Sequence, residues 1–446
     1  MPNRQSLRDV LQLRVDLWRI PLVLSVGTLL FFLATVQVDR AVARGALSLP
    51  AWISVGGPDD ARAILAAMLG AVSTVLALIF SVALLVLSMA VSQFGPRILY
   101  RFVRDGITQL TIGLFFASFL HTLLDFVVTR SDATGHFVPQ LTVMCGVALV
   151  IVSFVFLIVF SHRTAMSIQT QNVVARIVSD LDSALQELLD VLRTHSAIPE
   201  TPEAFAERDA LSDRCAAEGG IVPVPRTGFV QEVDLERLLA AADGADAVVR
   251  LLFRPGQFAV EGAPLCWVLP AAKAAGLTAE IRGAVKIGAQ RTLRQDLEFG
   301  IAQLVEIALR AMSAAVNDTF TGLTCIDWLG DELRVFAVHI TERGACLGAS
   351  GSIRLIWPPL RMTRLVKSAF DQIRQGAAAN PAVSIRLLQT FALLANQSEN
   401  PRLREALVEQ TEAVWEAAST KAFVMADRAD IETAYRRACA ALDMTA

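Results

Sequence analysis

The chain has 446 residues, of which 54% are hydrophobic and 19% are charged, and its formal net charge is −3. This composition is too apolar for an ordinary soluble protein of this size, and the nearly balanced charge gives no sign of nucleic-acid binding. We therefore expect a lipid bilayer among its partners and no nucleic acid. The apolar excess lies almost entirely before residue 162, and the rest of the chain has the dense charges typical of a soluble region.

Four apolar segments before residue 162 are long enough to cross a bilayer, for which a helix needs about 20 residues. They lie at about 20–38, within 63–94, at about 110–128 and at about 138–160. The motif Ala41-Val42-Ala43 resembles the cleavage site of a signal peptide, but the apolar run is long for one and three more spans follow. We therefore predict that the first span is retained and that 20–162 forms a four-helix transmembrane domain.

Basic residues predict the orientation of these spans, because cytoplasmic flanks carry an excess of Lys and Arg. Three clusters mark the inner ends: Arg4, Arg8, Arg14 and Arg19; Arg97, Arg101 and Arg104; and His162, Arg163 and Arg176. This bias places both termini in the cytoplasm. Segment 1–19 is then an interfacial entry helix or an ordinary basic flank. The middle cluster lies either at a cytosolic mouth or against lipid phosphates.

The second apolar segment has a face of small and hydroxyl residues. It starts at Pro58-Asp59-Asp60 and stops at Gly95-Pro96, so it is longer than a bilayer requires. The face comprises Gly70, Thr74, Ala77, Ser81, Ser88, Ser92 and Gly95, at spacings of three, four or seven residues. Such a face either packs against another helix or lines a water-filled path in an assembly of several copies. The second interpretation gives four pore-lining candidates: Thr74, Ser81, Ser88 and Ser92.

The third span contains two ionisable residues, His121 and Asp125, which lie four residues apart and thus on one side of a helix. Ionisable groups within a span are costly and usually face the protein interior or water. A role in permeation or in proton-linked transport is one interpretation of the pair. A structural hydrogen bond near the outer interface is the other, because Arg130 follows closely.

After the spans we predict a linking helix at 163–195, a small β-rich module at 196–275 and a mainly helical domain at 276–446. The linking helix has an apolar seam from Val174 to Leu192, which suits coiled-coil association or packing on the following domain. The run RPGQFAVEGAPLCWVL resembles the strand-turn-strand pattern of biotinyl- or lipoyl-like domains, which implies a barrel-like module. Its turn has no Lys, so we exclude a carrier role.

The helical domain begins with a strong helix at about 296–314, and Asn317 and Asp318 can cap the next helix, at about 320–333. No nucleophile elbow, P-loop, HExxH or dinucleotide fingerprint occurs, and the six cysteines lack metal-binding spacing. We therefore expect no enzymatic activity, no cofactor and no metal. The acidic residues between 296 and 327 fit helical surface charge better than a divalent-cation site.

Two stretches, ARAILAAMLGAVSTVLALIFSVALLVLSMAVSQFGPRILYRFVRDGITQLTIGLFFASFL and RTLRQDLEFGIAQLVEIALRAMSAAVNDTFTGLTCIDWLG, resemble a known family. It is the bacterial integral membrane proteins catalogued as domain of unknown function 2254, and the resemblance covers nearly the whole chain. Ser-Pro-Gly and Asn-Asp-Pro are usual in this family near the second stretch. Here these positions are Ser313-Ala314-Ala315 and Asn317-Asp318-Thr319, so the rigid loop that the prolines would form is not expected.

The sequence therefore predicts a membrane α-helical domain of four spans joined to an α+β cytosolic region. Our leading hypothesis is a homo-oligomeric channel of the bacterial inner membrane, which passes ions or small solutes along the second span under the control of its cytosolic domain. The alternative is a non-conducting sensor or scaffold whose cytosolic domain binds a ligand or a protein.

Overall fold

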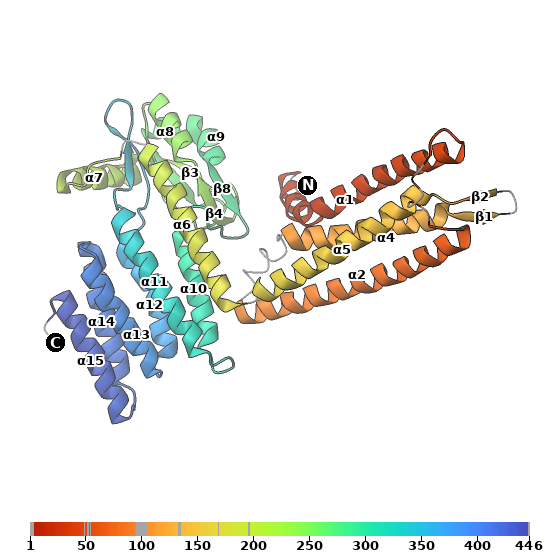
Figure 1. Ribbon diagram of the computed structural model, residues 1–446. Helices are drawn as coiled ribbons and strands as arrows, with labels where there is room; N and C mark the ends of the chain where they lie inside the picture. Colours follow the sequence, from red (N-terminus) through yellow and green to blue (C-terminus); the bar gives the residue numbers. More distant parts are fainter. Residues whose placement is uncertain are drawn as a thin grey trace. The chain divides into compact units, whose positions relative to one another are not determined.

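The computed structural model describes residues 4–48, 50, 53, 55–94, 106–132, 135–167, 169–194 and 197–444. These residues form two compact units, Met1–Asn172 and Val173–Ala446, each with a buried core of its own (Figure 1).

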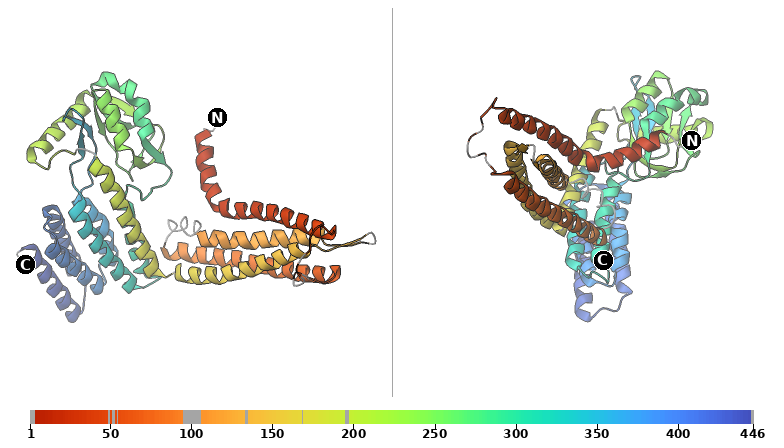
Figure 2. Two further views of the ribbon diagram at one scale, coloured as in Figure 1. Left: turned by 45° about the horizontal axis from the view of Figure 1, so that its top comes forward. Right: turned by 90° about the vertical axis from the view of Figure 1, so that its right-hand side faces the viewer.

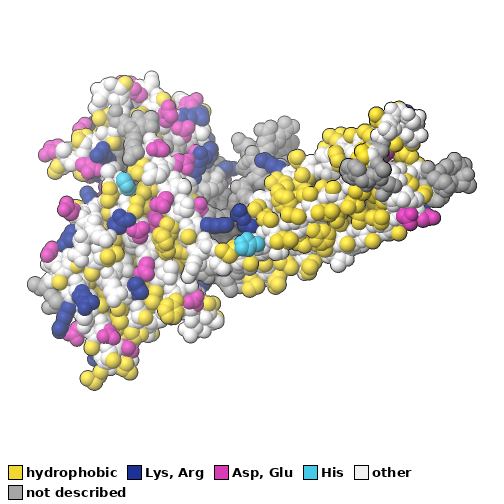
Figure 3. All heavy atoms as spheres, viewed as in Figure 1, with side chains coloured by type: hydrophobic (Ala, Val, Ile, Leu, Met, Phe, Trp, Pro, Cys, Tyr) yellow, Lys and Arg dark blue, Asp and Glu magenta, His cyan; other side chains and the backbone are white. Residues whose placement is uncertain are grey.

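The first unit is a bundle of four long helices with a short hairpin. Its elements are α1 (Arg4–Ala43), α2 (Pro58–Phe94), α4 (Gly106–Val128), β1 (Arg130–Asp132), β2 (Gly135–Phe137) and α5 (Gln140–Ser167). Each of the four helices contains a stretch long and apolar enough to cross a membrane, as predicted. The axis of α1 changes direction in the N-terminal part of the helix (Figure 2). Hydrophobic side chains cover much of the face of this unit that is seen in Figure 3.

α4 is the central helix of the first unit, since it packs against α1, α2 and α5. Half of the residues in its most apolar stretch are buried, compared with at most 28% in the corresponding stretches of the other three helices. The contact with α2 is apolar: Val72 and Ile79 pack with Phe115 of α4 and Phe160 of α5. α2 therefore turns a narrow apolar strip inward, and most of its described surface is not covered by the other helices of the first unit.

The second unit is mostly helical, with two small sheets. Its first part contains α6 (Thr170–Thr194), α7 (Pro202–Glu218), β3 (Gly220–Pro223), β4 (Gly228–Val233), α8 (Leu235–Gly244), β5 (Val248–Leu251), β6 (Phe258–Ala259), β7 (Pro264–Leu269), α9 (Ala274–Ala284) and β8 (Val285–Gly288). Its second part contains α10 (Leu297–Ala311), α11 (Thr319–His339), β9 (Ala345–Leu347), β10 (Ile353–Ile356), α12 (Met362–Ala377), α13 (Pro381–Gln397), α14 (Pro401–Ser419) and α15 (Met425–Leu442).

The strands of the second unit form two open sheets. One has the order β3-β7-β5-β10-β9, with β5 and β10 parallel, and the other has the order β6-β4-β8. Together they bury a core with α8 and α9 that includes Val249, Val268 and Ile281. The barrel-like closure expected for the β-rich module is not confirmed. The larger sheet is completed instead by β9 and β10, which come from between the helices of the second part.

The helices of the second unit begin where short polar side chains accept a hydrogen bond from the first free backbone N–H groups, which have no intrahelical partner. Asp296, Asp318, Asn380 and Asn400 do this for α10, α11, α13 and α14. The apolar seam of α6 packs on the rest of this unit: Leu181 is fully buried, and a Cβ at Gly300 of α10 would collide with it.

Candidate functional site

Asp39, near the end of α1, caps the N-terminus of α5. Its carboxylate accepts hydrogen bonds from the backbone N–H groups of Leu141 (3.0 Å) and Thr142 (2.9 Å) and from the Thr142 hydroxyl (2.6 Å). A carboxylate at this position also faces the positive end of the helix dipole. Asp39 is therefore a buried acid whose oxygens are both used, and it ties α1 to α5.

The predicted pair His121 and Asp125 lies beside this cap, and both side chains are fully buried. His121 Nε2 is 3.1 Å from the carbonyl oxygen of Thr142. Because a carbonyl oxygen only accepts, Nε2 carries a hydrogen and donates it. Asp125 Oδ2 lies 3.5 Å from the same Nε2. In the described part of the chain, three atoms of the pair have no hydrogen-bond partner: both carboxyl oxygens of Asp125 and Nδ1 of His121.

The surroundings of the pair are tightly packed. A Cβ on Gly146 of α5 would come within 2.9 Å of Asp125 Oδ2 and 3.1 Å of His121 Cδ2, so only glycine lets α5 approach so closely. On the other side, the rings of Phe31 and Phe32 of α1 lie 6.0 and 5.6 Å from the His121 ring. The two ionisable side chains are thus enclosed by α1, α4 and α5, in a setting where an unbonded carboxyl group is costly.

The pair ends a longer line of buried polar side chains, which we call the polar seam. It comprises Thr28, Thr35 and Asp39 of α1, Thr108, Gln109, Thr111, Ser118, His121, Thr122 and Asp125 of α4, and Thr142 and Ser153 of α5. The Ser118 and Ser153 hydroxyls are 2.7 Å apart and join α4 to α5. From Thr108 to Asp125 the seam extends roughly 25 Å, which is most of a bilayer core. Between Thr111 and Ser118 it is interrupted by Leu114 and Phe115.

The pore-lining candidates on α2 are in a different position. Thr74, Ser81 and Ser88, which we call the hydroxyl face, are exposed on the surface of the first unit. The Thr74 hydroxyl donates to the backbone oxygen of Gly70 (2.8 Å), within its own helix. The side chain of Ser92 and residues Arg97, Arg101 and Arg104 lie outside the described residues. The structure thus brings His121 and Asp125 close together, and it places the hydroxyl face on the surface of the first unit.

The remaining candidates, Asn317 and Asp318, lie in the second unit. Asp318 is the N-cap of α11, where Oδ1 accepts from Thr321 N (3.1 Å) and Oδ2 from the Thr321 hydroxyl (2.6 Å). Asn317 adopts a positive φ of 54°, which Asn tolerates better than most residues. Both residues therefore shape the start of a helix.

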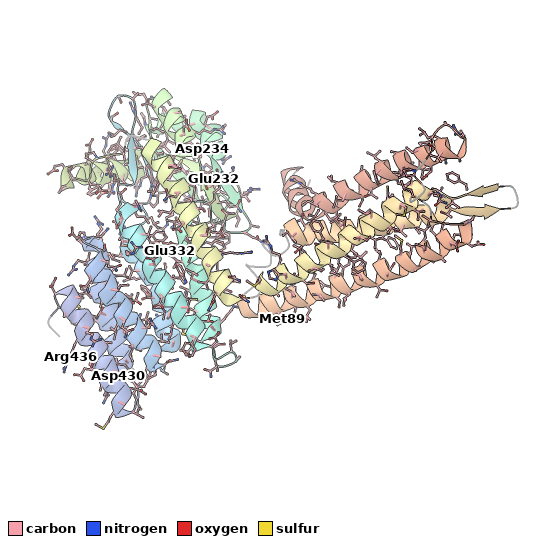
Figure 4. The ribbon with its side chains drawn as sticks, viewed as in Figure 1. Met89, Glu232, Asp234, Glu332, Asp430 and Arg436 are labelled. Atoms are coloured by element: carbon pink, nitrogen blue, oxygen red, sulfur yellow. The ribbon has the colours of Figure 1, made fainter. Side chains whose placement is uncertain are left out.

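A buried carboxyl group, Glu332, lies on α11 in the second unit (Figure 4). Burial raises its pKa from 4.5 to about 8, with smaller contributions from the negative charges of Asp182 and Asp331. Its side chain is 2% exposed, and Oε2 has no hydrogen-bond partner among the residues described.

The second unit also contains a cavity of about 310 Å³. It lies where the end of β5, the N-terminus of α10 and the C-terminus of α11 meet the loop after β10. Apolar side chains such as Leu251, Phe253 and Trp357 form most of its wall. This cavity could not be predicted from the sequence, because its wall comes from segments that are far apart along the chain.

Other residues of this region were not predicted from the sequence either: Asp39, Thr142 and the hydroxyls of the polar seam. A signal was present on α4, where Thr108, Thr111, Ser118, Thr122 and Asp125 follow one another at spacings of three, seven, four and three residues. That is the spacing of one helical face, as on α2.

Four long apolar helices joined to a separate folded unit define a polytopic membrane protein. The chain belongs to the family described as Predicted membrane protein (DUF2254), whose model matches residues 14–393. It is similar to Uncharacterized protein Mb1321c of Mycobacterium bovis and to Uncharacterized protein Rv1290c of Mycobacterium tuberculosis. Each is 29% identical over 391 residues, which cover 86% of this chain and 73% of the relative. No solved structure matches the chain.

Proposed function

We propose that this membrane protein conducts ions across the bacterial inner membrane, with both termini in the cytoplasm and the second unit as its cytosolic regulator. The observation that carries the proposal is the His121–Asp125 pair, which is fully buried among apolar helices and whose carboxyl oxygens have no hydrogen-bond partner in the described structure. Ionisable groups at such positions are costly in a span, and they mark ion or proton pathways in membrane proteins.

Hydrogen bonds within and between the helices account for much of the polar seam, including His121 Nε2, but not for Asp125. Asp39 is used as a cap, and the hydroxyls of Ser118 and Thr122 donate to carbonyl oxygens one turn earlier, Leu114 and Ser118. Such bonds satisfy a hydroxyl within its own helix. Neither Asp125 carboxyl oxygen has a hydrogen-bond partner among the described residues, so a role in holding a passing proton or cation explains its presence better than a role in packing.

A second route supports the homo-oligomeric form of the proposal. The hydroxyl face of α2 points away from the chain's own helices, while Val72, Ile79 and Val86 on the opposite side are buried. Copies assembled with these faces toward a common axis would enclose a path lined by hydroxyls, which solvate ions weakly enough to let them leave. In this arrangement the second span lines the path.

The alternative function is a non-conducting sensor or scaffold that binds a ligand or protein through its second unit. The cavity of about 310 Å³ favours it, because pockets of this size with mostly apolar walls are typical of small-molecule sites. No catalytic activity forms part of either proposal.

Conductance of the purified full chain in planar lipid bilayers tests the proposal. We expect currents in the wild type, which Asp125→Asn reduces about tenfold if the seam carries them. The double variant Ser81→Leu, Ser88→Leu reduces them by a similar factor if the hydroxyl face carries them. Ser73→Leu is the matched control, since Ser73 is exposed on α2 beside the hydroxyl face rather than on it.

The pattern of losses identifies the route. Loss with Asp125→Asn alone places the path inside each chain, and loss with the double serine variant alone places it between copies. Silent bilayers in repeated preparations of assembled wild-type protein would overturn the proposal and leave the sensor or scaffold.

A further inference from the structure

The cavity of the second unit has an apolar body. Leu235, Leu251 and Leu297 are buried in its wall, and Phe253 and Trp357 are partly buried there. These side chains come from the start of α8, from the end of β5 and the residues after it, from the start of α10 and from the loop after β10. A molecule placed among them would lose apolar surface to the protein, which favours an apolar ligand of matching size.

One end of this cavity is charged. Glu298 Oε1 accepts hydrogen bonds from Arg254 Nη2 (2.6 Å) and from Arg364 Nε (2.8 Å), so two guanidinium groups share one carboxylate oxygen. Beside them, Asp296 accepts from Arg291 Nε (2.7 Å) and Nη2 (2.9 Å). This network has three arginines and two acids, and therefore one excess positive charge.

The charged end continues into an open depression of about 380 Å³. Arg291, Arg364 and Gln257 line this depression, and Phe253 and Glu298 are shared between its wall and that of the cavity. The apolar cavity and the arginine-lined depression are therefore adjacent. Arg364 is 56% exposed and uses its Nε for Glu298, so its terminal nitrogens are accessible to an incoming anion.

We propose that this cavity and depression together bind a small amphipathic monoanion, with its apolar body in the cavity and its carboxylate or comparable head on Arg364 and Arg291. Arginine is suited to this because its planar fork can donate two parallel hydrogen bonds to one carboxylate. A cation is disfavoured, since both acids of the network are already bonded to arginine. This inference does not depend on ion conduction, and a protein that conducts nothing could still bind such a ligand.

Photolabelling of the full chain in phosphatidylcholine nanodiscs tests the inference. Two probes of equal length are compared, an eight-carbon acid and the corresponding alcohol, each carrying a diazirine on the chain, and labelled peptides are mapped by mass spectrometry. We expect the acid to label peptides that contain Phe253, Leu297 or Trp357. Excess octanoate should remove this labelling, and octanol should compete at least about fivefold less well.

Three variants locate the head and the body of the ligand. Arg364→Gln should reduce labelling by the acid about fivefold and leave labelling by the alcohol unchanged. Arg334→Gln, an exposed arginine paired with Asp331 on α11, should change neither. Val338→Trp should reduce labelling by both probes, because Val338 lines the cavity and is 72% exposed, so a larger side chain there narrows the entrance.

Several results would overturn the inference. Labelling confined to the spans would show that the cavity does not take up the probe. Equal labelling by acid and alcohol in the cavity, with no effect of Arg364→Gln, would show an apolar pocket without selectivity for an anion.

Discussion

The hydroxyl face of α2 and the polar seam of α4 have similar residues at similar helical spacing, but α4 buries them and α2 exposes them. On α4 the polar side chains meet partners from α1 and α5, such as the Ser118–Ser153 hydroxyl pair. On α2 the described hydroxyl side chains are exposed on the surface of the first unit, where Thr74 bonds to Gly70 of its own helix, while an apolar strip faces inward. A polar face on an apolar helix can therefore pack inside its own bundle, as on α4, or lie on the surface of that bundle, as on α2.

Glu332 of the second unit tests how much stability a buried acid costs outside the apolar spans, and its pH dependence should be the largest change that we predict. Its pKa is about 8 in the folded chain and near 4.5 when unfolded. Between these values the folded state keeps a proton that the unfolded state loses, so stability falls as pH rises from about 4.5 to 8, by up to roughly 5 kcal/mol. Below about pH 4.5 the Glu332 carboxyl group is protonated in both states, so no stability is lost. Well above pH 8 it is ionised in both states, so no further stability is lost.

Glu332→Gln should therefore flatten this dependence and raise the melting temperature of the second unit at pH 8 by about 10 °C relative to the wild type. Thermal melts at pH 5 and pH 8 measure it, with Glu416→Gln, an exposed acid of α14, as the control. Equal pH profiles for wild type and Glu332→Gln would show that this carboxyl is not protonated in the fold.

Asp39→Ala tests the buried side of the comparison, the polar seam between α1, α4 and α5. It leaves the N–H groups of Leu141 and Thr142 without an acceptor in a buried place, and we expect a loss of about 2 kcal/mol in stability. Unfolding of the full chain in mixed micelles measures this loss. Asp39→Asn keeps one acceptor and should cost less. If Asp39→Ala were as stable as the wild type, the cap would not hold α1 against α5.

Cysteine reactivity tests the exposed side of the comparison, the hydroxyl face of α2. Cysteines in place of Ser81 and Ser88 should react at least about tenfold faster with a water-soluble thiol reagent than cysteines in place of Ile79 and Val86, which face inward. The measurement uses membranes in which the native cysteines are replaced. Equal protection of both cysteine pairs from the reagent would mean that the hydroxyl face lies against lipid or another helix. The hypothesis of a path between copies would then be wrong.

The smallest expected effect is at the centre of the seam. A double-mutant cycle with Ser118→Ala and Ser153→Ala should give a coupling energy of about 0.6 kcal/mol, the usual size for a hydrogen bond between membrane helices. A coupling near zero would indicate that each hydroxyl is satisfied by the carbonyl oxygen one turn earlier in its own helix, Leu114 or Leu149, rather than by the facing serine.

Much of the fold was predictable from the sequence, because it depends on local patterns. The four spans follow from apolar length, and the start of α11 follows from Asp318 before its helix. Strands such as β4 (Gly228–Val233) follow from short apolar runs between turn residues. The arrangement of these strands was not predictable, since β10 pairs with β5 across about a hundred residues of chain.

The candidate site was predictable only in part. His121 and Asp125 were identified because ionisable residues are rare in spans and these two share a helical face. Asp39 was not identified, because its role depends on α5, which begins about a hundred residues later. The cavity and its arginines were missed for the same reason.

The sequence alone establishes that α2 and α4 are each long and apolar enough to cross a membrane and that each has a polar side, since helical spacing and apolar length are properties of one segment. Which of the two polar sides faces inward follows from the tertiary structure. Spacing fixes which residues share a face, but the direction of that face depends on which neighbours pack against it. The seam of α4 is inside because α1 and α5 supply Asp39, Thr142 and Ser153 as its polar surroundings, whereas α2 meets its neighbours through Val72 and Ile79.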